Sequence, residues 1–370
     1  MKKILFFWLC FAGMSCALFG QNIGQADAQF TLFPWASSYY NPGAAGEQNN
    51  TICFTGFFRQ EYMGYKDQNG SQTGETSETS TTTSNSSSSS STDKGSKYSD
   101  GQQFLANLDF YSRKIHGALT LSFLKDAVNR SSGLPHDNIG VRLGYAFKMN
   151  AGPGKLGIGA HVAFVNNAVD KSKMSLEVAE DPLVNEITES MMNLDFNVGA
   201  FYKTETWYAG VSLSHVLGPE APITLSGNTY LEPGRHLYVH GGYKWILPWF
   251  PSWVIEPQAL FKLNTPSAFG FDVMVLARYN GILWTGMSYR YQGGMNIMFG
   301  ARPFFNSSNN YLKGIDIGVA YDFPLTRIGR YKQGYSGGNV EVMIRYCFDI
   351  YRQETYSGYG NNRYIYKNQY

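Results

Sequence analysis

The residues of this chain that could do chemistry are chiefly its histidines, and they are scattered. They are His116, His136, His161, His215, His236 and His240. A serine hydrolase needs a histidine beside a nucleophilic serine and an orienting polar group. A phosphate-binding loop needs glycines followed by Lys-Ser or Lys-Thr at the start of a helix, which the glycines of residues 152–159 lack. We therefore expect no catalytic residues, no bound cofactor and no enzymatic activity.

Cysteine chemistry is equally limited. Only Cys53 and Cys347 remain if residues 1–20 are removed as a signal peptide. Two cysteines can pair in an oxidising compartment, but they are too few to form a disulfide scaffold. Neither has another Cys or a His at metal-ligand spacing, so we expect no metal site. The sequence leaves open whether the two cysteines form a disulfide.

Residues 1–20 have the layout of a secretory signal peptide. A basic start and an apolar stretch over residues 4–11 are followed by small residues. This order predicts export and cleavage, either after Ala17 or before Gln21. A lipid-modified Cys16 is a weaker alternative, because a glycine stands where such signals prefer an aliphatic residue.

The composition excludes several classes of protein. The chain is 43% hydrophobic with a mean hydropathy of -0.27, so its apolar residues are dispersed among polar ones. A polytopic helical membrane protein would need apolar runs of about 18 or more residues. Aromatic residues make up 16% of the chain, and charged residues make up 16%, against roughly 25% charged in soluble domains. A net charge of +2 indicates no nucleic-acid partner.

The mature chain alternates repeatedly between bulky apolar residues and small or polar ones. In residues 138–149, for example, Val141 and Leu143 flank Arg142. This period of two is typical of strands with two unlike faces. It predicts about 14 strands, near 51–63, 103–112, 115–124, 138–148, 155–166, 191–203, 206–216, 236–246, 253–263, 268–279, 282–292, 294–302, 311–323 and 339–348. Most exceed the five or six residues usual in globular sheets and suit tilted strands of about 9–11 residues that span a bilayer.

The sequence therefore predicts an all-β fold, a transmembrane antiparallel β-barrel with a short N-terminal segment and a C-terminal tail. We expect the leading segment at 21–50, the barrel at 51–348, a disordered Ser/Thr-rich outer loop at 66–101 and a Tyr-rich tail at 349–370. Long and short connections alternate along much of the chain, as in outer-membrane barrels. The aromatic residues of the leading segment allow two arrangements, one packed into or beneath the barrel and one at the membrane interface.

If the bulky faces contact lipid, the polar positions between them point into the barrel. The residues expected to line the lumen are Arg142, His161, Asp195, Asp272, Arg278, Arg302 and Asp316. Their charges are of both signs, which favours paired charges that fill the lumen over a selectivity ring of one sign. A polar pore, or a pocket for a segment of a partner, is the alternative.

Short motifs lie near both ends of the mature chain. The N-terminal motif residues are Asp27, Gln29, Phe30, Asn41, Pro42, Gly46, Arg59, Gln60 and Gly64. The C-terminal motif residues are Tyr321, Asp322, Tyr335, Ser336, Gly337, Gly338, Glu341, Arg345, Tyr346 and Phe348. In this order the motifs resemble those of the PorP/SprF family of outer-membrane proteins from the type IX secretion system. Glu61 and Tyr62 depart from the family pattern, which has a tryptophan there.

The resemblance implies a non-enzymatic outer-membrane barrel that takes part in type IX protein secretion, and in gliding motility or the attachment of cell-surface proteins. Its partners would be outer-membrane lipid and either other components of the secretion machine or a cognate secreted surface protein. A passive channel or a transporter for small solutes is the alternative, because 14 strands can enclose an open or a plugged lumen. A soluble β protein is a third possibility, and it would have to bury the bulky faces in a core.

Overall fold

The structure, a computed structural model of the 370-residue chain, is a barrel of antiparallel strands. It describes residues 27–47, 51–61, 63, 101–128, 136–169, 190–217, 223–226, 234–264, 268–291, 293–305, 312, 314–325 and 337–349. Within these ranges no helix has the length and apolar character needed to cross a membrane. The predicted signal peptide, the predicted outer loop up to residue 100 and the tail from residue 350 lie outside these ranges and stay predictions.

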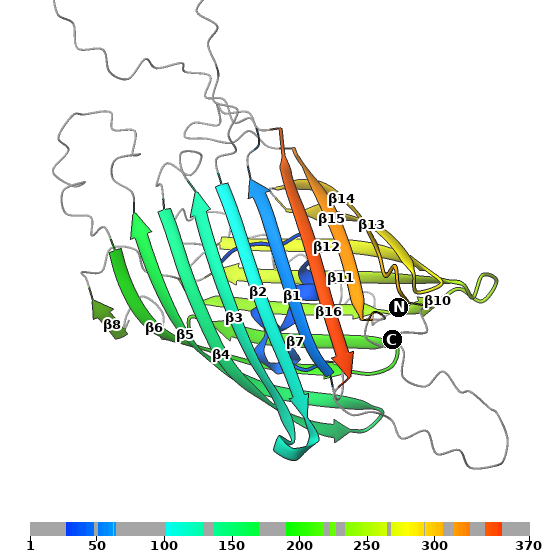
Figure 1. The fold of residues 1–370 in the computed structure, drawn as a ribbon, viewed down its shortest axis with the longest axis horizontal. Coiled ribbons are helices and arrows are strands. Elements are labelled where there is room, and N and C mark those ends of the chain that lie inside the picture. The colour runs from blue at the N-terminus through cyan, green and yellow to red at the C-terminus, as the bar shows by residue number, and fades with distance from the viewer. Residues whose placement is uncertain are drawn as a thin grey trace, which may run out of the picture.

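Among the described residues, fourteen long strands follow one another around a closed ring, each antiparallel to its neighbours (Figure 1). They are β1 (Thr51–Glu61), β2 (Gly101–Ser112), β3 (Gly117–Val128), β4 (His136–Ala151), β5 (Gly154–Val169), β6 (Ser190–Lys203), β7 (Trp207–Ser214), β9 (His236–Tyr243), β11 (Trp253–Asn264), β12 (Ala268–Tyr279), β13 (Leu283–Arg290), β14 (Gly294–Ala301), β15 (Ile315–Pro324) and β16 (Asn339–Asp349). Pairing of β1 with β16 closes the ring. The predicted antiparallel barrel of about 14 strands is confirmed.

Two short strands and some boundaries differ from the prediction. Strand β10 (Trp245–Ile246) pairs with β11, and β8 (Ile223–Ser226) pairs with β6. The sequence assigns β8 to a long loop, but β7 pairs with only one half of β6, and β8 supplies backbone partners for the other half. Strand β2 begins one residue inside the predicted loop, because Gly101 pairs with Glu61.

The alternation in the sequence becomes the two faces of the barrel wall. On β4, Val141 and Leu143 are 37% and 57% exposed, whereas Arg142 between them is 4% exposed. Large apolar side chains cover the outside around the ring, and polar side chains lie inside. Lipid solvates such an outer face, so this arrangement is the one expected of a barrel in a bilayer.

The two ends of the barrel differ in their connections. Short turns join β2 to β3 through the 3-10 helix η4 (Arg113–Ile115), β4 to β5, and β6 to β7. The start of β1 and the end of β16 lie at this same end (Figure 1). We call it the short-turn end and the opposite one the long-loop end. In outer-membrane barrels the short turns face the periplasm, so we expect the short-turn end to be periplasmic.

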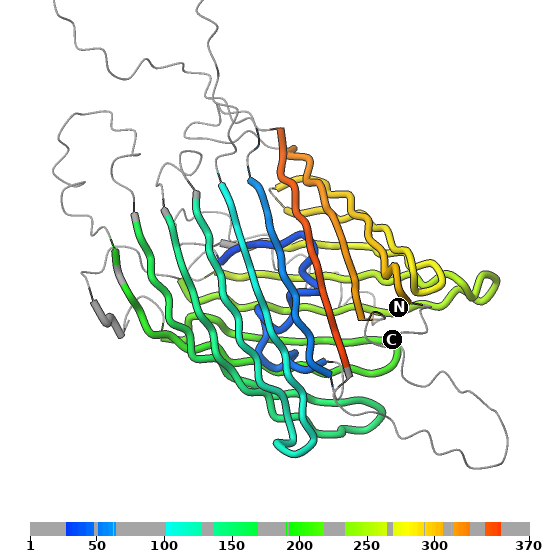
Figure 2. Tube along the Cα trace, viewed as in Figure 1, coloured from blue at the N-terminus to red at the C-terminus, as the bar shows by residue number. Residues whose placement is uncertain are grey.

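Residues 27–47 lie inside the barrel, and we call them the plug. Its short helices are η2 (Phe33–Ala36), α2 (Ser37–Tyr40) and η3 (Pro42–Ala44). Figure 2 shows this segment, in blue, within the ring of strands. Phe30, Leu32 and Tyr39 are each 0% exposed. Of the two arrangements that the sequence allows for its leading segment, the structure shows the one packed into the barrel.

Glycines on the inner wall let the plug lie against the backbone of the strands. A Cβ atom on Gly159 of β5 would lie 2.6 Å from the carbonyl group of Pro42. One on Gly199 of β6 would lie 2.2 Å from Oδ1 of Asn41. Both distances are shorter than van der Waals contact, so only glycine fits at these positions. The small inner positions of β5 and β6 therefore make room for the plug.

A disulfide between Cys53 and Cys347 joins the two strands that close the barrel. The cysteines lie directly opposite each other in the register of β1 and β16. They are 294 residues apart in the sequence. A cross-link that closes so long a loop removes much of the conformational freedom of the unfolded chain.

Replacing both cysteines by serine is expected to lower the free energy of unfolding by about 2–5 kcal/mol, because the unfolded chain regains that freedom. Urea unfolding, followed by the loss of the fast-migrating folded band on unheated gels, measures the change. Reducing agent should lower the midpoint of the wild type toward that of the double variant and leave the variant unchanged. Equal midpoints for the oxidised wild type and the variant would contradict this role of the disulfide.

Candidate functional site

Residues from both ends of the sequence meet around Arg59, near the long-loop end of β1. The guanidinium of Arg59 contacts the carboxylates of Glu61, Asp322 and Glu341 at 2.9, 2.6 and 3.0 Å. The plug joins them through the hydroxyl of Thr31, which donates to Asp322 at 2.7 Å and accepts from Arg59 at 3.0 Å. We call these five residues the seam network, because β1 and β16 close the barrel.

The carboxylate of Glu341 also holds the backbone of the plug. It accepts hydrogen bonds from the N–H groups of Thr31 at 2.7 Å and Leu32 at 2.9 Å. Glu341 is 1% exposed and Arg59 is 2% exposed, so water does not compete for these partners. A buried charge that loses its partner is strongly destabilising. The seam network therefore ties the plug to β1, β15 and β16.

A second ionic group lies inside the barrel on three adjacent strands, β11, β12 and β13. Asp272 of β12 contacts Lys262 of β11 at 2.7 Å and Arg290 of β13 at 3.3 Å. Lys262 also donates to the side-chain oxygen of Gln29 in the plug at 2.9 Å. The plug is thereby bonded to this part of the wall as well.

Asp27 anchors the start of the described plug at the long-loop end. Its carboxylate lies 3.0 Å from Arg142 of β4 and 3.1 Å from His215, the residue after β7. Tyr238 of β9 donates to the same carboxylate at 3.0 Å. Burial alone would raise the pKa of Asp27, but the charges of Arg142 and His215 outweigh burial and hold that pKa well below its usual value. Asp27 is therefore ionised.

Asn41 fixes the middle of the plug. Its Nδ2 donates to the carbonyl oxygen of Ala200 at 2.9 Å and lies 3.1 Å from Nε2 of His240. Its Oδ1 accepts from the backbone N–H of Gly43 at 2.9 Å. Lys148 of β4 donates to the carbonyl oxygen of Gly43 at 2.7 Å. These bonds hold the plug against β4, β6 and β9.

Trp35 packs the plug against the wall nearer the short-turn end. Its ring stacks on that of Trp284 of β13, with centroids 4.5 Å apart. Its Nε1 donates to Asp316 at 3.1 Å, and Arg302 contacts the same carboxylate at 3.2 Å. Arg278 lies over the Trp35 ring, 5.3 Å from its centroid. Ring stacking and ion pairs therefore hold this part of the plug to the wall.

Glu47 ends the described plug at the short-turn end. It forms an ion pair with Lys203, the last residue of β6. Burial would raise the pKa of Glu47, but the ammonium group of Lys203 outweighs burial and lowers that pKa to about 2. The plug therefore crosses the whole lumen, from Asp27 at one end to Glu47 at the other.

The seven residues predicted to face the lumen all lie on the inner face of the wall. Those in ion pairs are Arg142, Asp195, Asp272, Arg278, Arg302 and Asp316. His161 is 1% exposed, and neither of its ring nitrogens has a hydrogen-bond partner among the described residues. The structure thus brings together paired charges of both signs, and the alternative of a pocket for a segment of a partner stays open.

Most of the motif residues that the structure describes contact the plug or belong to it. The plug contains Asp27, Gln29, Phe30, Asn41, Pro42 and Gly46, and the wall partners are Arg59, Asp322 and Glu341. Phe30 packs on Phe57 of β1 with ring centroids 5.1 Å apart. Gly46 has a φ of 62°, a conformation that favours glycine at the turn leaving the plug.

The other motif residues have different surroundings. The hydroxyl of Tyr321 donates to the carbonyl oxygen of Gly337, and Gly338 has a φ of 110° before β16. Arg345 donates to the sulfur of Cys347 at 3.2 Å. Outward positions in the strands are held by Gln60, Tyr346 and Phe348. The described residues do not include Gly64, Tyr335 and Ser336.

Residues 334–338 read Gly-Tyr-Ser-Gly-Gly and so match the G-x-S-x-G pattern of serine hydrolases. In those enzymes the serine stands on a sharp turn between a strand and a helix. Here the pattern is followed by strand β16 in an all-β barrel. The pattern therefore occurs without the helix that follows the serine in those hydrolases.

Sequence reasoning missed several residues of this interface. Lys262 and Arg290 alternate with bulky residues in predicted strands, so the same rule that selected Asp272 points to both. His215 and His236 lie at strand ends, where the alternation does not indicate whether a side chain faces the lumen or lipid. Trp35 lies in a segment without any period, and nothing in the sequence indicates its partner.

A cavity of about 170 Å³ opens at the short-turn end beside the end of the plug. Its cationic lining residues are Lys203, Lys244, Arg278, Arg302 and Arg345. Its acidic lining residues are Glu47, Glu205 and Glu256. Aromatic rings, among them Trp35 and Trp207, complete the wall. Lys203, Arg278 and Arg302 are paired with Glu47, Glu256 and Asp316. The small excess of positive charge that is left favours a negatively charged occupant.

Comparison with known proteins gives a family and a fold. The sequence model of a family described as type IX secretion system membrane protein PorP/SprF matches residues 96–346, which include much of the C-terminal motif and none of the N-terminal one. No curated protein matches the chain. Among solved structures, the TodX deltaS2S3 mutant monoaromatic hydrocarbon channel is similar over 85% of this chain and 94% of its own, with 10% identity and a TM-score of 0.50. The CymD monoaromatic hydrocarbon channel covers 91% of this chain and 98% of its own, with 10% identity and a TM-score of 0.47.

Proposed function

Because this chain belongs to the PorP/SprF family of type IX secretion system membrane proteins, we propose that it is a plugged barrel that docks other parts of the secretion machine or anchors a secreted surface protein. The outer-membrane barrel itself follows from the family and the fold. The docking or anchoring role is our proposal and goes beyond the family and the fold.

The plug is the observation that carries this proposal. Between Asp27 and Glu47 it is bonded to the wall at both ends of the lumen. The seam network adds buried hydrogen bonds between Thr31 and Leu32 of the plug and the charged groups of the wall. A lumen filled in this way favours a barrel that presents surfaces over one that conducts solutes.

The cavity at the short-turn end is the docking surface that the charges favour. Cationic side chains outnumber carboxylates in its lining, and aromatic rings stand between them. Arg and Lys side chains bind carboxylates, and aromatic rings supply rigid contact area. An acidic segment of a periplasmic partner, or of the anchored protein, matches this lining.

A strain that lacks the gene is expected to leave cargo unsecreted or unattached, and the wild-type gene should restore both. The variant Lys244→Glu, which reverses one charge in the cavity, should restore cargo attachment less well. Lys125→Glu is the matched control, because Lys125 is exposed on β3 and outside the cavity. Immunoblots of outer membranes show that the barrels are equally abundant.

Normal secretion and attachment in the deletion strain would overturn the docking function. Full restoration of cargo attachment by Lys244→Glu would show that the cavity is not the docking surface. The second candidate, a passive channel or transporter, is favoured by the likeness of the fold to a channel with a TM-score of 0.50. It requires the plug to leave the lumen, and conductance measurements distinguish it.

A further inference from the structure

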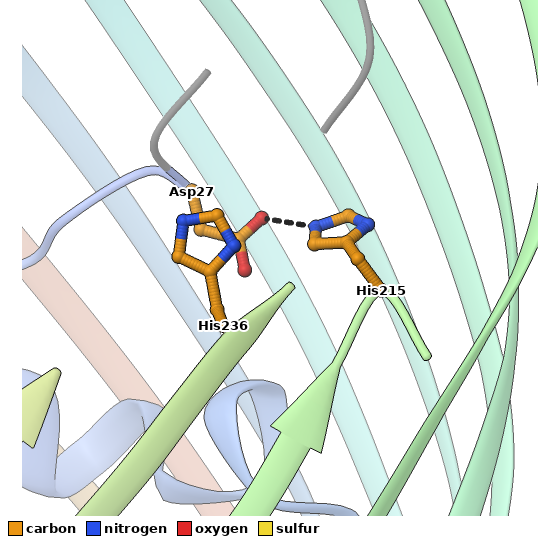
Figure 3. Close-up of side chains that lie close together, drawn as sticks. All are labelled: Asp27, His215 and His236. Carbon is orange, nitrogen blue, oxygen red and sulfur yellow. Dashed lines mark hydrogen bonds and ion pairs between the residues drawn. The ribbon is translucent and has the colours of Figure 1, made fainter. Parts of the chain in front are cut away.

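Asp27, His215 and His236 bring three metal-ligating side chains together near the long-loop end of the lumen, and we call them the Asp27 site (Figure 3). One ligand atom from each lies within 4.8 Å of the others. Oδ1 of Asp27 and Nε2 of His215 are 3.1 Å apart. Two ligand atoms on one tetrahedral zinc ion lie about 3.3 Å apart, given bonds of about 2.0–2.1 Å. The spacing therefore suits a shared ion.

His215 is oriented as metal-bound histidines are. Its Nδ1 lies 2.6 Å from a carboxylate oxygen of Asp195 on β6, so its Nε2 faces Asp27. In metal sites the ring nitrogen that does not bind the ion usually donates to a carboxylate, which fixes the tautomer and the ring. Asp195 is in place to act in this way.

His236, the first residue of β9, is buried, and its ring nitrogens are poorly satisfied among the described residues. It is 4% exposed, and neither ring nitrogen makes a hydrogen bond of normal geometry to the described residues. Figure 3 shows its ring beside the Asp27 carboxylate. A contact to the backbone of Gly234 is its one interaction of hydrogen-bond type among the described residues. A buried polar atom without a well-formed hydrogen bond is costly, and a bond to a metal ion would remove that cost.

Space for further ligands adjoins the site. A cavity of about 40 Å³ borders on Asp27 and His215, and Asn138 and Asn167 add polar groups to its wall. A water molecule needs about 10–15 Å³ of such volume. Water in this cavity would complete the coordination of an ion.

Two other groups already contact the Asp27 carboxylate. Arg142 lies 3.0 Å from Oδ1, and the Tyr238 hydroxyl donates to Oδ2 at 3.0 Å. The guanidinium charge opposes a cation nearby, so the affinity should be lower than that of a structural zinc site with four protein ligands.

We propose that Asp27, His215 and His236 bind one divalent transition-metal ion of the zinc class. Imidazole and carboxylate ligands together suit Zn²⁺ and Co²⁺. The ion joins the plug to residues at the ends of β7 and β9 and so fixes the plug at the long-loop end. This inference does not depend on the docking function.

The test titrates the full-length, chelator-treated barrel with Zn²⁺ in a calorimeter and with Co²⁺ in a spectrophotometer. The wild type is expected to bind one ion, and His236→Ala to bind it at least about tenfold more weakly. His161→Ala is the matched control and should bind as the wild type does. His161 is likewise a buried lumenal histidine, at 1% exposure, whose ring nitrogens lack a hydrogen-bond partner in the described part of the chain, but it lies outside the cluster.

The fast-migrating folded band on unheated gels shows whether each variant keeps its barrel. Folded His236→Ala with weakened binding, beside an unchanged His161→Ala, supports the site. A wild type that binds no stoichiometric ion overturns it. Equal affinities of the wild type and His236→Ala overturn it as well.

Discussion

Replacing Arg59 by alanine is expected to lower the free energy of unfolding by about 3–5 kcal/mol. Arg59 is 2% exposed and contacts three carboxylates, those of Glu61, Asp322 and Glu341. Without the guanidinium these buried carboxylates lose their shared counter-charge. Thr31 loses a hydrogen bond as well, so the plug should loosen from the seam.

Urea unfolding, followed by the folded band on unheated gels, measures this loss. The matched control is Lys125→Ala, which breaks an ion pair with Asp137 whose side chains are 47% and 51% exposed. Exposed pairs contribute at most about 1 kcal/mol, so this variant should unfold nearly as the wild type does. Similar midpoints for Arg59→Ala and Lys125→Ala would show that the seam network does not stabilise the barrel.

The variant Gly159→Val is expected to displace the middle of the plug and open the lumen. A Cβ atom at this position would lie 2.6 Å from the carbonyl group of Pro42. The atoms in the way belong to backbone, which cannot move aside as a flexible side chain does. Overpacking of this kind usually costs about 1–3 kcal/mol, and shifting the plug relieves it.

Swelling of proteoliposomes in small sugars measures the opening. Vesicles with Gly159→Val should swell, and vesicles with the wild type should not. Gly140→Val is the control, because a Cβ atom on Gly140 would have its nearest neighbour at 3.9 Å and the residue borders a cavity. Swelling of Gly140→Val to the same extent would mean that the effect is not due to the plug.

The barrel could be predicted because the pattern that indicates it lies within each single strand. Whether Val141 faces lipid and Arg142 faces the lumen follows from the period of two within one strand. Long strands, low charge and turns of alternating length then leave few folds other than a membrane barrel. The small differences, such as β8, arise where a strand needs a backbone partner that a loop supplies.

The sequence left two arrangements open for the plug and could not decide between them, because the residues that hold the plug are far apart in the sequence. Thr31 and Glu341 are 310 residues apart, and no periodicity links them. Aromatic residues such as Phe30 and Tyr39 suit either a membrane interface or a packed lumen, since both bury apolar surface. The motifs at the two ends of the chain were the one sequence feature related to this contact. In the structure Asp322 and Glu341, from the C-terminal motif, accept hydrogen bonds from Thr31 in the N-terminal motif segment.

Residues 27–47 lie in the lumen and are bonded to the wall at both of its ends, and the proposed docking function requires that they close it. The most direct measurement is the conductance of the purified wild-type barrel in planar lipid bilayers. The buried contacts from Asp27 to Glu47 predict no steady conductance. A steady, wide conductance of the wild type would contradict the closed lumen and favour a channel.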